Sequence, residues 1–133
     1  MRMADLIDFS STSSSRESSP GEKYQAFWPP SDVPLPMITF VLQDGSRESF
    51  CYVDLSRVRF LNPEQPGQGP VLVLRFLGTE IIDVTVKGRG LQRMYDPVVE
   101  HRIAMMSVFN GRFDTLGDGV TVINSITLQT TGQ

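Results

Sequence analysis

The stretch VLVLRFLGTEIIDVTVK, residues 71–87, decides the fold class of this chain. Its first part is almost unbroken in apolar side chains, which is typical of a central strand covered on both faces of a sheet. Its second part alternates, so that Ile82, Val84 and Val86 are expected to face the core. Gly78 begins the turn between the two parts. The stretch therefore predicts a β-hairpin.

Three further strands are predicted before this hairpin. The runs at 37–43 and 47–53 alternate in the same way, and the Asp-Gly pair between them is a strong short-range hairpin signal. The run SRVRF at 56–60 predicts a half-exposed strand, because Val58 and Phe60 would face inward while its two arginines face solvent.

A helix and one last strand are predicted after the hairpin. Asp96 followed by Pro97 is a favourable N-cap and first-turn pair, so we expect the main helix at about 97–107. The run VTVINSITLQ at 120–129 predicts the last strand, in which Asn124 marks a bend or finds a polar partner. The apolar side chains that fall close to one helical stripe are Leu91, Met94, Tyr95, Val98, Val99, Ile103 and Met106.

These elements predict an α+β fold, mainly antiparallel β. About six strands are expected to form a small barrel or a strongly curled sheet, with one helix between the last two strands. The length of 133 residues fits one domain, which we place at 37–133. The expected core comprises Ile38, Phe40, Leu42, Phe50, Tyr52, Val58, Phe60, Leu72, Leu74, Phe76, Ile82, Val84, Val86, Val98, Ile103, Val122 and Ile126.

Residues 1–36 are expected to form a flexible N-terminal arm rich in serine and proline. Residues 10–22 hold no large apolar side chain, so they can bury little that would offset the entropy cost of ordering them. A short apolar cluster near the tip and three aromatic residues near the end could dock on a partner or on a neighbouring subunit. These partner-docking residues are Leu6, Ile7, Phe9, Tyr24, Phe27 and Trp28.

The residue types needed for catalysis or metal binding are sparse. His101 is the only histidine and is expected on the solvent face of the predicted helix, and no nucleophile motif is present. Cys51 is the only cysteine, which excludes a multi-cysteine zinc site. The aspartates near 114–118 do not complete a calcium loop, because Ser125 stands where its glutamate would be. We therefore predict no catalytic residues, no cofactor and no metal.

Basic residues gather between positions 57 and 93 and suggest an alternative function. On a small barrel, such a surface can bind single-stranded nucleic acid. The formal net charge of -3 gives no overall attraction to a polyanion, so we do not favour this interpretation. The residues of this alternative nucleic-acid surface are Arg57, Arg59, Arg75, Lys87, Arg89 and Arg93.

The sequence as a whole predicts a non-catalytic protein-interaction or assembly subunit, whose arm docks on a neighbouring subunit or partner. A homo-oligomer or a protein partner is expected. The longest apolar run, 71–77, contains Arg75 and is far shorter than the roughly 20 residues of a membrane helix, so no membrane span is expected. The single cysteine and the lack of a signal-peptide core indicate a cytoplasmic protein.

Overall fold

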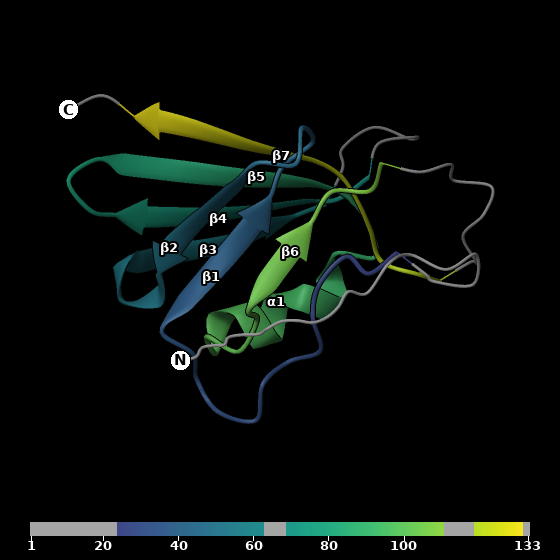
Figure 1. Cartoon of the computed structure of the whole chain (residues 1–133), viewed down its shortest axis with the longest axis horizontal. Helices are drawn as coiled ribbons and strands as arrows, with labels where there is room; N and C mark the ends of the chain where they lie inside the picture. The colour runs from purple at the N-terminus through teal and green to yellow at the C-terminus, as the bar shows by residue number, and fades with distance from the viewer. Residues whose placement is uncertain (1–23, 63–68, 111–118, 132–133) are drawn as a thin grey trace, which may run out of the picture.

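The computed structural model describes residues 24–62, 69–110 and 119–131. These residues form seven strands, one α-helix and a short 3-10 turn, η1. The strands make two separate sheets, and Figure 1 shows the smaller sheet lying across one face of the larger. No helix in the described ranges is long and apolar enough to cross a membrane.

The smaller sheet has the strand order β2-β1-β6. Strands β1 (Met37–Val41) and β2 (Arg47–Cys51) are antiparallel, which confirms the predicted hairpin. Gly45 in the turn has a φ of 88°, a conformation that glycine adopts without steric cost. Strand β6 (Met105–Ser107) pairs with β1 in parallel, so segments about 65 residues apart lie side by side.

The larger sheet has the order β3-β4-β5-β7, and all its pairs are antiparallel. Its strands are β3 (Leu55–Leu61), β4 (Val71–Leu77), β5 (Ile81–Arg89) and β7 (Val122–Thr131). The predicted hairpin at 71–87 is confirmed, with β4 and β5 in the middle of the sheet. The face away from the smaller sheet, here called the outer face, leaves the outward side chains of β4 half-buried or exposed. Strand β4 is therefore central but covered on one face.

The predicted closed barrel or strongly curled sheet is wrong. A barrel needs an unbroken ladder of neighbouring strands, and this chain changes sheet three times, after β2, after β5 and after β6. The 3-10 turn η1 (Tyr52–Asp54) separates β2 from β3, which then join different sheets. Strand β6 pairs with β1 and not with β7, so no described strand links the two sheets into one surface.

The core lies between the two sheets. Phe50 and Phe76 stack with ring centroids 4.5 Å apart, and Phe40 meets Phe76 edge to face at 6.3 Å. Every residue of the predicted core is buried or packs against the buried cluster. Outside that set, the buried apolar residues are Ala26, Leu91, Met94, Met106, Val108 and Ile123.

The helix was predicted in the wrong place. Helix α1 covers Gln92–Val99 and lies between β5 and β6, so a further strand separates it from β7. Asp96 does not cap it but lies within it, where its carbonyl accepts the Glu100 N–H at 3.0 Å. The helix ends in a Schellman motif, because the His101 N–H donates to the Val98 carbonyl and the Arg102 N–H to the Pro97 carbonyl.

The described part of the arm packs along the smaller sheet. Phe27 forms an antiparallel bridge with Met106, and the Ser107 N–H donates to the Ala26 carbonyl at 2.8 Å. The Trp28 N–H donates to the Met105 carbonyl at 3.2 Å. Residues 26–28 therefore continue this sheet beyond β6.

Candidate interaction surfaces

An apolar groove lies where the end of α1, the start of β1 and the η1 turn meet. Its volume is about 570 Å³. The η1 turn directs Tyr52 into the core and leaves Val53 86% exposed at the groove. We call this site the His101 groove, and it is lined by Leu35, Pro36, Met37, Cys51, Tyr52, Val53 and His101.

His101 forms one wall of this groove by stacking on Tyr52, with ring centroids 4.6 Å apart. The prediction that His101 lies on the solvent face of a helix is therefore wrong. It is a half-buried residue just beyond the end of the helix, with a φ of 64°. Its carbonyl accepts the Leu35 N–H at 2.8 Å, which holds the proline-rich segment against the end of the helix.

Tyr52 is fixed from the other side by its hydroxyl, which donates to the Ile103 carbonyl at 2.7 Å. Burial raises the pKa of Tyr52 far above its ordinary value, so the phenol is neutral at physiological pH. Tyr52 is therefore held by its hydroxyl and by the stacked ring, and it adds no charge to the groove.

The groove contains no metal-binding cluster. Within residues 24–62, 69–110 and 119–131, no group of three His, Cys, Asp or Glu side chains could hold a metal ion. Cys51 is exposed at the end of β2. The aspartates considered for calcium, Asp114 and Asp118, fall outside the described residues, whereas the neighbouring Gly119 is described.

Tyr24 is an internal clamp. Its hydroxyl donates to the Ser107 carbonyl at 2.5 Å and accepts the Ile123 N–H at 3.1 Å. Its ring meets Phe109 edge to face at 4.8 Å. Burial raises the pKa of Tyr24 to about 12. Tyr24 thus ties β6, in one sheet, to β7, in the other.

The other predicted docking residues have different environments. Phe27 is half-buried in its bridge to Met106, whereas Trp28 is 43% exposed. Leu6, Ile7 and Phe9 lie outside the described residues. Of the three aromatic residues predicted to dock, Trp28 is thus the one whose side chain remains most accessible.

Three of the predicted basic residues meet on the outer face. Arg57 and Arg59 are exposed on the edge strand β3, and Arg57 is paired in register with Arg75 on β4. Arg75 makes a two-pronged ion pair with Asp83, with N–O distances of 2.8 and 3.0 Å. The hydrogen bond from Arg75 lowers the pKa of Asp83, and Arg57 adds to this effect.

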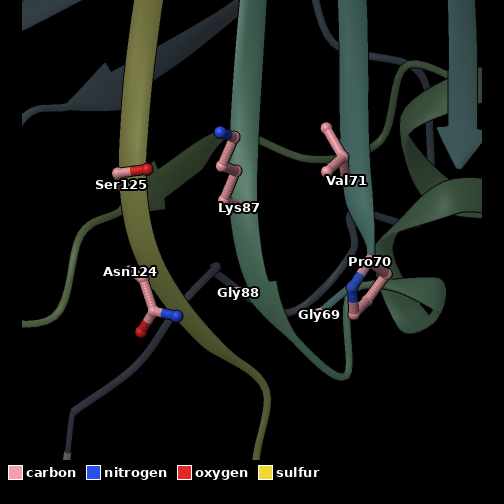
Figure 2. A pocket seen from close by; sticks show the side chains of 7 residues that line it. All are labelled: Gly69, Pro70, Val71, Lys87, Gly88, Asn124 and Ser125. Carbon is pink, nitrogen blue, oxygen red and sulfur yellow. The ribbon is translucent and has the colours of Figure 1, made fainter. Parts of the chain in front are cut away.

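The remaining basic residues lie farther along the chain. Lys87 on β5 borders a pocket of about 350 Å³, shown in Figure 2, where β7 bulges at Asn124. Arg89 is exposed two residues later on the same strand. Arg93 lies on α1, where its guanidinium donates to the Gly119 carbonyl. The six residues are thus divided between the sheet and the helix.

Apolar side chains share the outer face with the arginines. Leu77 is 46% exposed there, and Leu61, Val71, Val73 and Ile81 are exposed or half-buried. None of the outward positions on the four described strands of this sheet carries an aromatic ring. The outer face therefore offers apolar and cationic contacts without a stacking platform for bases.

The His101 groove was not predicted from the sequence. One signal was present: with Phe50 and Tyr52 facing inward, the alternation left Cys51 and Val53 together on the outward side of the same run. Two apolar side chains at outward positions indicate a surface that another molecule can cover.

Comparison of the chain with protein-family models, curated proteins and solved structures finds no match. No relative therefore supplies a function for the groove or for the outer face. Function has to be inferred from the exposure, charge and contacts of the residues themselves.

Proposed function

We propose that this protein is a non-catalytic interaction or assembly subunit, in which the N-terminal arm of one chain docks in the His101 groove of a neighbour. The observation that carries the proposal is the apolar groove itself, with Val53 86% exposed beside Met37, which is 43% exposed. Large apolar side chains gathered around a concave site are typical of a protein contact. The proposal includes a cytoplasmic location, where the exposed Cys51 would stay a free thiol.

The arm carries a segment suited to such a groove. Leu6, Ile7 and Phe9 are apolar residues close together in the sequence. Fully burying side chains of this size is worth about 1.5–3 kcal/mol each, part of which offsets the cost of ordering the segment. Residues 10–22 could span about 45 Å when extended, which is enough to reach an adjacent subunit.

The test measures the molar mass of the full-length protein by multi-angle light scattering. We expect deletion of residues 1–22 and the substitution Val53→Asp each to lower the mass of the assembly, because one removes the ligand and the other places a charge in its apolar site. Val33→Asp is the matched control, since Val33 is 60% exposed but does not line the groove. An unchanged mass after the deletion would contradict the proposal.

The second candidate function is binding of single-stranded nucleic acid through the outer face. It is supported by the neighbouring, exposed Arg57 and Arg59. It is the weaker candidate because Asp83 already neutralises Arg75 and because the outer face has no aromatic ring in the described strands. The test is fluorescence anisotropy with single-stranded RNA and DNA at low salt. Neutralising Arg57, Arg59 and Arg89 together should weaken binding and flatten its salt dependence.

A further inference from the structure

Strand β7 is one of the two edges of the larger sheet in the part of the chain that the structure describes. Its ten residues, Val122–Thr131, include no charged side chain and no proline. Tyr24 and Phe109 bond to its backbone at Ile123, near its start. Beyond that point, β5 is the one described strand that pairs with it, and in Figure 1 its C-terminal half forms the border of the molecule. Every second N–H and C=O of an edge strand points away from its partner.

The other sheet edges in the described residues carry features that oppose pairing. Strand β2 has Arg47 and Glu48, and β3 has Arg57 and Arg59. The row at 26–28 beside β6 is followed at once by two prolines. Charges and prolines on an edge are the usual protection against pairing with another chain. Strand β7 lacks both, which singles it out as the edge open to a partner.

We propose that β7 pairs with β7 of a second copy of this chain, antiparallel about a two-fold axis, to give one continuous eight-stranded sheet. With the axis at Thr127, each Thr127 lies opposite its counterpart, and Ile126 meets Leu128 of the other copy. This register pairs apolar with apolar on the core side. Moving the axis to Leu128 would place Ile126 opposite Thr130, and moving it to Ile126 would place Leu128 opposite Asn124. Thr–Thr and aliphatic cross-strand pairs are both favourable in antiparallel sheets.

Charges on the next strand are compatible with this register. Asp83 is in register with Gln129 and Lys87 with Ser125. Across the two-fold axis, Ser125 lies opposite Gln129 of the other copy, so the Lys87 row of one copy continues into the Asp83 row of the other. Lys87 of one copy and Asp83 of the other, which carry opposite charges, therefore lie in one row across the sheet. They are three strand spacings, or roughly 14 Å, apart. No like charges meet across the joint between the described strands.

This contact uses neither the arm nor the His101 groove, so it goes beyond the proposed function. An isologous pairing of β7 makes a closed dimer. Docking of the arm would link chains through different surfaces. The two contacts can therefore be tested separately on the same protein.

The first experiment measures dimer dissociation by sedimentation velocity of the full-length protein over a dilution series. Thr127 is exposed, so Thr127→Lys should fold normally but place two ammonium groups opposite each other. We expect the dissociation constant of the dimer to rise at least about tenfold. Thr79→Lys, which adds the same charge at the exposed β4–β5 turn, should leave it unchanged. Equal dissociation constants for Thr127→Lys and the wild type would overturn the proposal.

The second experiment tests the register by crosslinking. Cys51 is replaced by serine, and Thr127→Cys is compared with Thr79→Cys under mild oxidation. Directly opposite residues have Cα atoms about 4.5–5.5 Å apart, within the range that a disulfide spans. We expect a covalent dimer with the Thr127→Cys variant alone, and the same dimer after deletion of residues 1–22. If the full-length Thr127→Cys variant forms no covalent dimer, the proposed β7 pairing is wrong, and the docking of the arm in the groove is unaffected. If the covalent dimer forms in the full-length protein but not after the deletion, the proposed pairing is also wrong, because the arm then holds the copies together.

Discussion

The imidazole ring of His101 lies 4.6 Å from the phenol ring of Tyr52, and the two planes are only 11° from parallel. This stack is formed by a residue in the left-handed region, with a φ of 64°. Such a conformation costs a side-chain-bearing residue roughly 1–2 kcal/mol, and glycine is the usual residue after a helix. His101 is thus a case in which a tertiary contact offsets local strain.

Substitutions at His101 should separate the strain from the stack. His101→Ala removes the ring but keeps the strained backbone, whereas His101→Gly removes both. We expect the glycine variant to have a free energy of unfolding about 1 kcal/mol higher than the alanine variant. Urea denaturation measures both values. Equal stabilities would show that the left-handed conformation is not a cost at this position.

Removing the hydroxyl of Tyr24 should loosen the joint between the sheets. Tyr24→Phe leaves the Ile123 N–H and the Ser107 carbonyl without this partner, in a partly buried position. The expected loss in the free energy of unfolding is about 1–3 kcal/mol, measured by urea denaturation. Tyr95→Phe is the control, because the Tyr95 hydroxyl makes no hydrogen bond with a described residue and its loss should change stability little.

Tyr24 should also make the fold sensitive to alkali. An unfolded tyrosine loses its proton near its ordinary pKa of about 10, whereas burial holds the folded pKa of Tyr24 at about 12. The stabilisation from the neutral phenol is therefore complete below the unfolded pKa and is lost as pH rises through the folded pKa. The free energy of unfolding should fall over this interval, and the fall should be smaller in Tyr24→Phe. An identical pH profile for the two proteins would contradict this assignment.

A methyl group at Gly88 should be severely destabilising. A Cβ there would overlap the Val122 carbonyl oxygen, which belongs to the backbone of the neighbouring strand and cannot move aside. We expect Gly88→Ala to cost more than about 3 kcal/mol or to prevent folding. Gly78→Ala is the matched control, because its nearest atom would be the Asp54 Oδ2 at 3.9 Å and its effect should stay within about 0.5 kcal/mol. Thermal unfolding followed by circular dichroism compares the two variants.

Alternation along the chain predicted the local structure well, because the face on which a side chain lies depends on its own strand. Val84 and Val86 were placed in the core on this basis, and both are buried. The division into two sheets was not predictable in this way. It depends on the parallel pairing of Phe40 with Met106, and nothing in either segment marks the other as its partner.

The errors at the helix and the groove have a common cause. The pair Asp96 and Pro97 resembles a helix start when read locally, but burial of Leu91 and Met94 against the core favours an earlier start. The end is set by a left-handed His101, which local propensity disfavours and the stack on Tyr52 permits. The His101 groove depends on the same residue. Because the end of the helix was predicted in the wrong place, the groove beside it was not predicted either.

The position of β1 between β2 and β6 has a consequence for folding during synthesis. The β1–β2 hairpin leaves the ribosome first among these elements, but the second neighbour of β1, Met105–Ser107, emerges only after β3, β4, β5 and α1 have been made. The edge of β1 that faces β6, with the N–H of Thr39 and the carbonyl of Val41, must therefore wait for its partners Ala104 and Val108 until that segment has been made. Pairing between segments so distant in sequence slows folding, so a nascent chain of this protein should depend on protection from aggregation until β6 is available.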